Sequence, residues 1–325
     1  MRIAILDDYQ DCVRSLDCFA QLDGHDVLVL NESIADPAAL AARIADREAL
    51  VLIRERTRVG AELLDRLPAL RLISQTGRAG GHIDEAECTA RGVAIAAGTG
   101  SPLAPAELTW ALVLAASRGL VAEAQALRAG RWQSRLGRTV RGRTLGILGY
   151  GNIGRLVAGY GTAFGMRVLA HGGAGSRERA GADGIAFESE RGAFFAACDV
   201  LSVHLRLAPS TRGMIDAADL AAMRPDALFV NTSRAELVAP GALLAALDAG
   251  RPAMAALDVF EREPADESDP LIAHPRVLAT PHIGYVERDS YELYFGTAFQ
   301  HLLAFAGGKP TGIVNPAALA VRSGR

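Results

Sequence analysis

Short apolar runs alternate with helical stretches along this chain, and the alternation occurs in two separate series. Runs that are apolar throughout are typical of parallel strands buried on both faces. Their alternation with helices predicts a doubly wound α/β fold with two sheets. The predicted strands are RIAIL (2–6), DVLVL (26–30), ALVLI (49–53), RLIS (71–74) and VAIA (93–96) in the first series, and TLGIL (144–148), MRVLA (166–170), DVLSVHL (199–205), ALFVN (227–231), MAALDV (254–259) and RVLAT (276–280) in the second.

Two helical stretches lie outside these series. Residues 98–132 meet no helix breaker between their Gly- and Pro-rich start and Gly119, and Pro105 suits a first helical turn. We expect one or two long helices there, linking two domains. Residues 287–310 predict an amphipathic helix that stops at a Gly-Gly-Lys-Pro sequence and can return to pack on the first domain.

Size and charge exclude several classes of protein. The 325 residues suffice for two domains, each with its own core. The net charge is 34 − 37 = −3, and no cluster of Lys and Arg indicates a nucleic-acid surface. No apolar run has membrane-spanning length, and the run Ile3–Leu6 is too short for a signal peptide. We therefore expect neither nucleic acid nor a membrane as partner.

The four cysteines are Cys12, Cys18, Cys88 and Cys198, and their spacing fits no zinc site. We expect no metal. Isolated cysteines of this kind are typical of reduced, partly buried thiols in a cytoplasmic protein.

A glycine motif lies between the first strand of the second series and the apolar helix after it. It reads Gly149-x-Gly151-x-x-Gly154, with Asn152 and Ile153 inside it. In this βαβ setting the first glycine permits a tight turn, the second lets the backbone approach a pyrophosphate, and the third allows close helix packing. The N–H groups of the helix N-terminus then face the phosphates. The motif predicts a dinucleotide site; the alternative is a turn that binds nothing.

The next strand end discriminates between NAD and NADP. NAD sites usually have an acid there to hold the ribose 2′-OH. Here AHGGAGSRERA (170–180) has no acid before Glu178 and instead carries His171, Arg177 and Arg179. Arginines can seat the 2′-phosphate of NADP, although they are equally compatible with a solvated surface. We lean slightly to NADP and keep NAD open; His171 and Arg177 are candidate cofactor contacts.

A bound dinucleotide implies hydride transfer, which needs a proton donor and acceptor near neutral pH. Histidine suits both directions, and an arginine suits a substrate carboxylate. Loops after three strands of the second series supply these residue types: Arg234 in VNTSR, Glu263 in DVFEREP and His282 in TPHIGY. His274, in a proline-flanked loop, is interpreted as a surface residue.

These motifs together resemble the D-isomer-specific 2-hydroxyacid dehydrogenase family. Six segments match the motifs of this family in order over most of the chain. They are SQTGRAGGHIDEAECTARGVAIAAG, PAELTWALVLAASR, HLRLAPSTRGMI, VNTSRAELV, LDVFEREP and ATPHIGY. The resemblance implies a Rossmann-type NAD(P)-binding domain, residues 99–284, inserted into a flavodoxin-like substrate domain, residues 1–98 plus 285–325. It also implies a homodimer with contacts on the cofactor domain.

The resemblance assigns three catalytic residues. His282 becomes the general acid/base for the substrate oxygen. Glu263 becomes its hydrogen-bond partner, which fixes the orientation of the imidazole. Arg234 binds the carboxylate and carbonyl of a 2-oxo acid. The substrate class is therefore a small 2-oxo or 2-hydroxy acid.

The resemblance also implies binding residues. Asp258 is expected to hold the nicotinamide carboxamide. His204, Thr211 and Thr232 are expected to line the cofactor. The backbone N–H groups of Gly77, Arg78 and Ala79 are expected to receive the substrate carboxylate, although the family usually has a second glycine where Ala79 stands.

Two alternatives stay open. One is a related enzyme acting on phosphoglycerate, formate or phosphite; formate enzymes have Gln beside the histidine, so Glu263 argues against that substrate. The other is a non-enzymatic NAD(H)-sensing module like the corepressors related to this family. The side chain of the substrate is not specified by the sequence, although the arginine-rich stretch IRERTR favours an acidic group if it faces the substrate.

Overall fold

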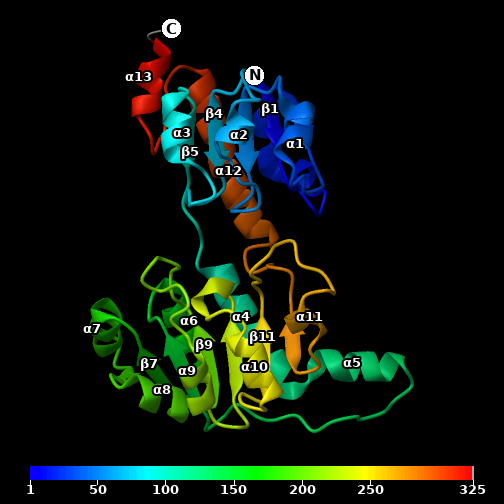
Figure 1. Cartoon of the computed structure of the whole chain (residues 1–325), viewed down its shortest axis with the longest axis vertical. Helices are drawn as coiled ribbons and strands as arrows, with labels where there is room; N and C mark the ends of the chain where they lie inside the picture. The colour runs from blue at the N-terminus through cyan, green and yellow to red at the C-terminus, as the bar shows by residue number, and fades with distance from the viewer. Residues whose placement is uncertain (324–325) are drawn as a thin grey trace. The chain divides into compact units, whose positions relative to one another are not determined.

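The computed structural model describes residues 1–323 and divides the chain into two compact units. The first combines Met1–Ser101 with the chain from Glu287 onward, and the second is Pro102–Val286. Each unit is an α/β sandwich around a parallel sheet (Figure 1). The predicted fold class, with a Rossmann domain inserted into a flavodoxin-like one, is confirmed.

The described strands of the first unit form a sheet of order β2-β1-β3-β4-β5, all parallel, which is the flavodoxin-like order. Four of its strands, β1, β3, β4 and β5, are completely or largely buried, which explains their continuous apolar runs, whereas the edge strand β2 has no fully buried residue. They are β1 (Arg2–Ile5), β2 (Asp26–Val29), β3 (Ala49–Leu52), β4 (Leu72–Gln75) and β5 (Ala94–Ala97).

Helices cover this sheet from segments far apart in the chain. One apolar core lies between the sheet and α1, α2 and α3. Against β4 packs α12, where the Ser74 hydroxyl donates to the Ala298 carbonyl over 2.9 Å. The helices are η1 (Val13–Ser15), η2 (Asp17–Leu22), α1 (Pro37–Ile44), α2 (Ala61–Leu64), α3 (Glu85–Ala90), α12 (Arg288–Ala306) and α13 (Ala317–Ser323).

The second unit holds a parallel sheet of order β12-β11-β10-β9-β6-β7-β8 among the described residues. The order reverses between β6 and β9, and such a switch point is where α/β sheets of this kind bind ligands. One strand, β8, was not predicted, because two residues give no apolar run. The strands are β6 (Thr144–Leu148), β7 (Arg167–His171), β8 (Ala186–Phe187), β9 (Val200–Val203), β10 (Leu228–Asn231), β11 (Met254–Leu257) and β12 (Val277–Ala279).

Both faces of this sheet are covered by helices, and each face has its own buried core. The long predicted helical stretch is two helices, α4 and α5, separated by Gly119 in the left-handed conformation at φ +61°. The helices are α4 (Leu103–Arg118), α5 (Leu120–Arg128), α6 (Asn152–Ala163), α7 (Ala174–Ala182), α8 (Arg191–Ala197), α9 (Ala217–Ala222), η3 (Ala235–Leu237), α10 (Ala242–Asp248) and α11 (Pro270–Ala273). Among the described residues, none of the helices has the length and apolar character to cross a membrane.

Candidate active site

The glycine loop connects β6 to α6 at the switch point of the second sheet. Gly149 has φ +97°, and a Cβ there would lie 2.7 Å from the His204 carbonyl oxygen. A Cβ on Gly154 would lie 2.5 Å from the Gly149 oxygen, so both positions exclude larger residues. At Gly151, by contrast, a Cβ would meet nothing within 4 Å. Its open side and the uncapped N-terminus of α6 fit a pyrophosphate.

The two inner residues of the motif have different environments. Asn152 is exposed in the first turn of α6, whereas Ile153 packs partly buried on the core below. Tyr150 stabilises the loop through its hydroxyl, which donates to Asp183 over 3.0 Å, and its backbone N–H, which donates to the Ser176 hydroxyl. Tyr150 and Ser176 were not predicted to support the loop.

The end of β7 differs from the loop that the sequence predicts. Helix α7 starts there directly, with Gly173 as an uncapped N-terminus and no acid in its first turn. His171 donates from Nδ1 to the Glu188 carbonyl over 2.7 Å and stacks on Phe194, with ring centroids 5.0 Å apart. The Arg177 guanidinium lies 5.1 Å from the ring centroid of Phe187. Both side chains therefore rest on phenylalanines beside the glycine loop.

The remaining predicted cofactor residues lie in loops after β9 and β10. His204 is hydrogen-bonded through Nε2 to the Ser202 hydroxyl over 2.8 Å, and burial lowers the pKa of His204 to about 3, so its ring is neutral. The Thr211 hydroxyl accepts from the Ala208 N–H and closes its own loop. The Thr232 hydroxyl lies 2.7 Å from that of Thr109 on α4.

Glu263 and His282 come together although 19 residues separate them in the chain. His282 Nδ1 donates to Glu263 Oε2 over 2.6 Å, and Glu263 Oε1 accepts from the Phe260 N–H over 3.0 Å. Burial alone raises the pKa of Glu263, but the hydrogen bond and charge of His282, with the charge of Arg234, bring that pKa below its usual range. The pair is therefore a carboxylate that orients an imidazole.

Arg234 follows β10 and is fixed at the backbone. The buried Asn231 side chain accepts from the Ser233 N–H over 3.0 Å and donates to the Arg234 carbonyl over 2.9 Å. The Arg234 guanidinium donates to the Ser233 carbonyl over 2.7 Å. Asn231 was missed as a support residue. The available signal was a polar residue at the end of an apolar strand.

Asp258 lies where the sequence predicts, directly after β11, but it is fully buried. Its carboxylate accepts hydrogen bonds from the loop that carries His282. Oδ1 accepts from the Thr280 hydroxyl over 2.6 Å and from the Ile283 N–H over 2.9 Å, and Oδ2 accepts from the Gly284 N–H over 2.8 Å. Burial raises the pKa of Asp258, and these hydrogen bonds oppose the rise.

In the first unit, Gly77, Arg78 and Ala79 follow β4. Gly77 is buried at φ +78°, and the Arg54 guanidinium occupies the space that a Cβ on Gly77 would need. Arg78 is exposed, and Ala79 packs against the apolar core. Arg54 also has a positive φ of 55°. Its contact with Gly77 was not predicted.

The interpretation of His274 as a surface residue was wrong. Its side chain is only 9% exposed, with Nε2 3.4 Å from Asp248 Oδ1 and Nδ1 accepting from the Arg276 N–H. The short helix α11 ends at Ala273, and His274 is its C-cap residue. Within the described residues, no group of His, Cys, Asp and Glu side chains could hold a metal ion.

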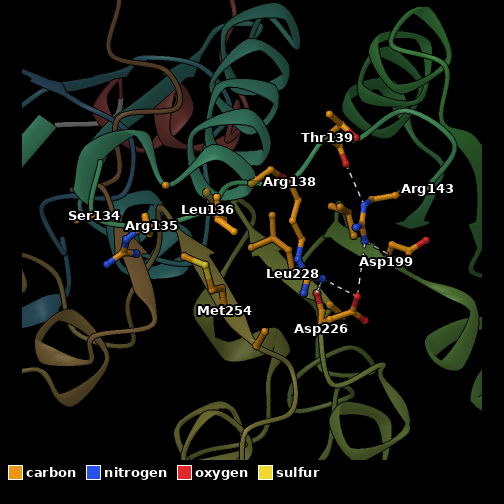
Figure 2. Close-up of a pocket in the computed structure, with 16 residues that line it drawn as sticks. Ser134, Arg135, Leu136, Arg138, Thr139, Arg143, Asp199, Asp226, Leu228 and Met254 are labelled. Atoms are coloured by element: carbon orange, nitrogen blue, oxygen red, sulfur yellow. Dashed lines mark hydrogen bonds and ion pairs between the residues drawn. The ribbon is translucent and has the colours of Figure 1, made fainter. Parts of the chain in front are cut away.

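A cavity of about 370 Å³ lies away from these residues, at the starts of β9, β10 and β11. Val200, Leu228 and Met254 line it, and Figure 2 shows Arg138 directed to Asp226 on its wall. The glycine loop and the Glu263–His282 pair follow the carboxyl ends of the strands, whereas the cavity lies at their amino ends. The cavity is therefore part of neither the glycine loop nor the Glu263–His282 site.

Comparison with known proteins agrees with this geometry. Residues 110–284 match the model of the D-isomer specific 2-hydroxyacid dehydrogenase, NAD binding domain. A glyoxylate reductase of Aeropyrum pernix is 39% identical over 82% of this chain and 82% of its own length. A rat D-3-phosphoglycerate dehydrogenase is 30% identical over 98% of this chain, which spans 59% of the rat protein.

Solved structures agree as well. A phosphoglycerate oxidoreductase from Vibrio cholerae is 52% identical, with a TM-score of 0.93 over 95% of this chain and 99% of that one. An oxidoreductase from Ralstonia solanacearum is 54% identical, with a TM-score of 0.97 over 100% and 99%. The fold and the site define a nicotinamide-dependent oxidoreductase with a Rossmann domain. The chain belongs to the D-isomer specific 2-hydroxyacid dehydrogenase family, and its second unit carries the NAD binding domain of that family.

Proposed function

We propose that this protein interconverts a D-2-hydroxy acid and the matching 2-oxo acid by hydride transfer, with His282 as the general acid/base. The observation that supports this most is the 2.6 Å bond from His282 to Glu263, on the sheet edge that also carries the glycine loop. The glycine loop would hold the dinucleotide, which would supply or accept the hydride. The protein has to move the accompanying proton and bind the acid.

His282 performs the proton transfer in this proposal. Because Nδ1 donates to Glu263, Nε2 is the ring nitrogen left to exchange a proton with the substrate oxygen. In reduction, the imidazolium gives its Nε2 proton to the oxygen as the hydride reaches the carbon, and the Glu263 carboxylate stabilises the charged ring beforehand. In oxidation the same nitrogen accepts the proton.

Arg234 binds the substrate in this proposal. A guanidinium presents two parallel N–H donors that match a carboxylate, and it can polarise the neighbouring carbonyl. The two hydrogen bonds of the Asn231 side chain, to the Ser233 N–H and the Arg234 carbonyl, keep the Arg234 backbone in place. In the first unit, we assign Gly77, Arg78 and Ala79 to the substrate carboxylate through their backbone N–H groups. We assign these residues to the cofactor: Gly149, Gly151, Asn152, Ile153, Gly154, His171, Arg177, His204, Thr211, Thr232 and Asp258.

A second substrate candidate is 3-phosphoglycerate. The Vibrio cholerae relative, 52% identical, is called a phosphoglycerate oxidoreductase. Arg54 against Gly77, with exposed Arg78 beside it, offers positive charge to an acidic substrate group. Other relatives are called glyoxylate reductases, so a small uncharged side chain is the first candidate.

The test is a screen of 2-oxo acids with NADH and NADPH, followed by absorbance of the reduced cofactor. We expect turnover of glyoxylate, pyruvate or the 2-oxo acid of 3-phosphoglycerate, giving the D-hydroxy product on chiral chromatography. No turnover with any acid, together with tight NADH binding, would support the NAD(H)-sensing module instead.

For the cofactor, we retain the slight leaning to NADP. Two observations support it: the first turn of α7 has no acid, and the Arg177 guanidinium lies over Phe187. The Arg179 side chain contributes less, because its Nε already donates to the Tyr150 carbonyl over 2.8 Å. We expect Kd for NADPH to be at or below that for NADH by calorimetry, and Arg177→Ala to weaken only NADPH. Markedly tighter NADH binding in the wild type would contradict this choice.

We also propose a homodimer. Large apolar side chains are exposed on α5 and the segment after it, which extend from the sheet of the second unit in Figure 1: Leu120 (62%), Val121 (44%), Leu127 (57%), Trp132 (77%) and Leu136 (100%). Exposed apolar groups gathered in this way are typical of an interface. Sedimentation equilibrium should give a dimer, Leu136→Asp should weaken it, and Leu293→Asp, on α12, should not. A monomeric wild type would overturn the proposal.

The compartment we propose is the cytoplasm. Its support is that the four cysteines are free thiols, three of them buried, as is typical of proteins in a reducing compartment. Thiol titration of protein purified without reductant should give four thiols per chain; a disulfide would contradict this location.

A further inference from the structure

Tyr150 separates the first two glycines of the glycine motif, and both of its backbone polar groups are bonded to α7. Its N–H donates to the Ser176 hydroxyl over 3.1 Å, and its carbonyl accepts from Arg179 Nε over 2.8 Å. Its hydroxyl donates to Asp183 Oδ2 over 3.0 Å. Because Ser176, Arg179 and Asp183 follow one another at intervals of three and four residues, they lie on one face of α7. That face holds the middle of the glycine loop.

The neighbouring backbone groups of the loop have partners as well. The Gly149 N–H donates to the His171 carbonyl, and the Gly151 N–H donates to the Gly149 carbonyl, each over 2.9 Å. The N-terminus of α6, by contrast, receives no side-chain cap from the described residues. The loop is thus held on the side of β7 and α7, while the first N–H groups of α6 are left for a pyrophosphate.

Two further contacts keep α7 close to the loop. A Cβ on Gly172 would lie 2.8 Å from the Ser176 hydroxyl oxygen, so a side chain at this turn would displace the hydroxyl from the Tyr150 N–H. The Asp183 carboxylate also accepts two hydrogen bonds from Arg155 of α6, from Nε over 2.7 Å and from Nη2 over 2.8 Å. This carboxylate therefore joins the loop, α6 and α7.

We propose that Ser176 and Arg179 are positioning residues of the dinucleotide site, which hold the peptide groups of Tyr150 and so shape the glycine loop before the cofactor binds. The proposal rests on the dinucleotide site of the proposed function. It gives Arg179 a role that differs from that of Arg177, whose guanidinium lies over Phe187. A loop that is shaped in advance loses less conformational entropy on binding, so its supports raise the affinity for the pyrophosphate.

The test uses Ser176→Ala, which removes the acceptor of the Tyr150 N–H. Alanine is the best helix former, so α7 should persist. We expect Kd for NADH and for ADP-ribose, which both carry the pyrophosphate, to rise about tenfold by calorimetry. Kd for adenosine, which lacks the pyrophosphate, should stay within about twofold by ligand-observed NMR. A displacement of the whole helix would instead weaken adenosine as much as ADP-ribose.

A second variant and a second readout accompany this test. Arg179→Met keeps the aliphatic part of the side chain and loses the donor, so it should show the same pattern of affinities. Glu178→Gln, at an exposed residue of the same helix, is the matched control and should bind as the wild type does. Hydrogen exchange at the Tyr150 amide needs no ligand, and it should be faster in Ser176→Ala than in the wild type and the control.

The outcomes separate this proposal from the proposed function. Wild-type affinity for ADP-ribose in Ser176→Ala, or an equal loss of affinity for adenosine, would overturn the positioning role. Since no measurement here needs turnover, the role of Ser176 is decided even where the screen of 2-oxo acids finds no substrate. Absence of turnover with intact NADH binding counts against the proposed function alone. A wild type that bound no NADH would overturn both.

Discussion

The His282→Ala variant is expected to lose about 10²-fold or more in kcat and to bind NADH as the wild type does. Proton transfer from a positioned side chain contributes about 10²-fold to 10⁴-fold. The alanine variant keeps the glycine loop, whose contacts involve no atom of the His282 side chain. Steady-state kinetics with a 2-oxo acid from the screen, and calorimetry with NADH, measure the two quantities.

The matched control is His274→Ala. His274 also has a carboxylate neighbour, Asp248, but it lies outside the site, so its removal should leave kcat unchanged. Glu263→Gln should lie between wild type and His282→Ala, because a glutamine can still accept from Nδ1 while it no longer stabilises the imidazolium. Full activity in His282→Ala would remove the proposed mechanism altogether.

Arg234→Ala is expected to lower kcat/KM for 2-oxo acids by about 10³-fold, with both kcat and KM affected. Two charge-assisted hydrogen bonds are worth about 3–6 kcal/mol, and each 1.4 kcal/mol is a factor of ten. Stopped-flow and steady-state kinetics with glyoxylate and pyruvate give kcat, KM and the rate of the hydride step separately.

Arg234→Lys separates charge from geometry. Lysine keeps the positive charge but lacks the planar fork, so it should restore only part of the loss. Arg251→Ala, at the opposite edge of the same sheet, should match wild type. If Arg234→Ala had wild-type parameters for glyoxylate and pyruvate, the proposed substrate class would be wrong.

The fold was predictable because parallel strands buried on both faces leave an unmistakable pattern. The ALVL run of β3 is buried at every position and was predicted as a strand. The hydrophobic pattern did not predict the elements that are short or rich in glycine. The two residues of β8 are too few to show a periodicity. The start of α7 was not predicted because Gly172, Gly173 and Gly175 are typical of a loop.

The site was predictable only to the level of its motifs. The resemblance named Glu263 and His282, but nothing in the sequence gives the contacts of Asp258 with Thr280 and Gly284. Those contacts depend on the register of two strands: Leu257 of β11 pairs with Ala279 of β12, and this pairing brings the next residues of both strands together. All three residues of β12 are apolar and partly buried, so the sequence has no alternation there that would specify the register.

The first unit is formed by two segments that the whole second unit separates in the sequence, and this affects the order of folding during translation. Its sheet is complete by Ala97, but Phe295 and Phe299 of α12, both fully buried, are translated only after the whole second unit. The second unit is continuous in sequence and has all its own residues by Val286. On the ribosome, therefore, the unit in the middle of the chain can finish folding first, and the N-terminal sheet has to wait with an apolar face uncovered until the last helices emerge.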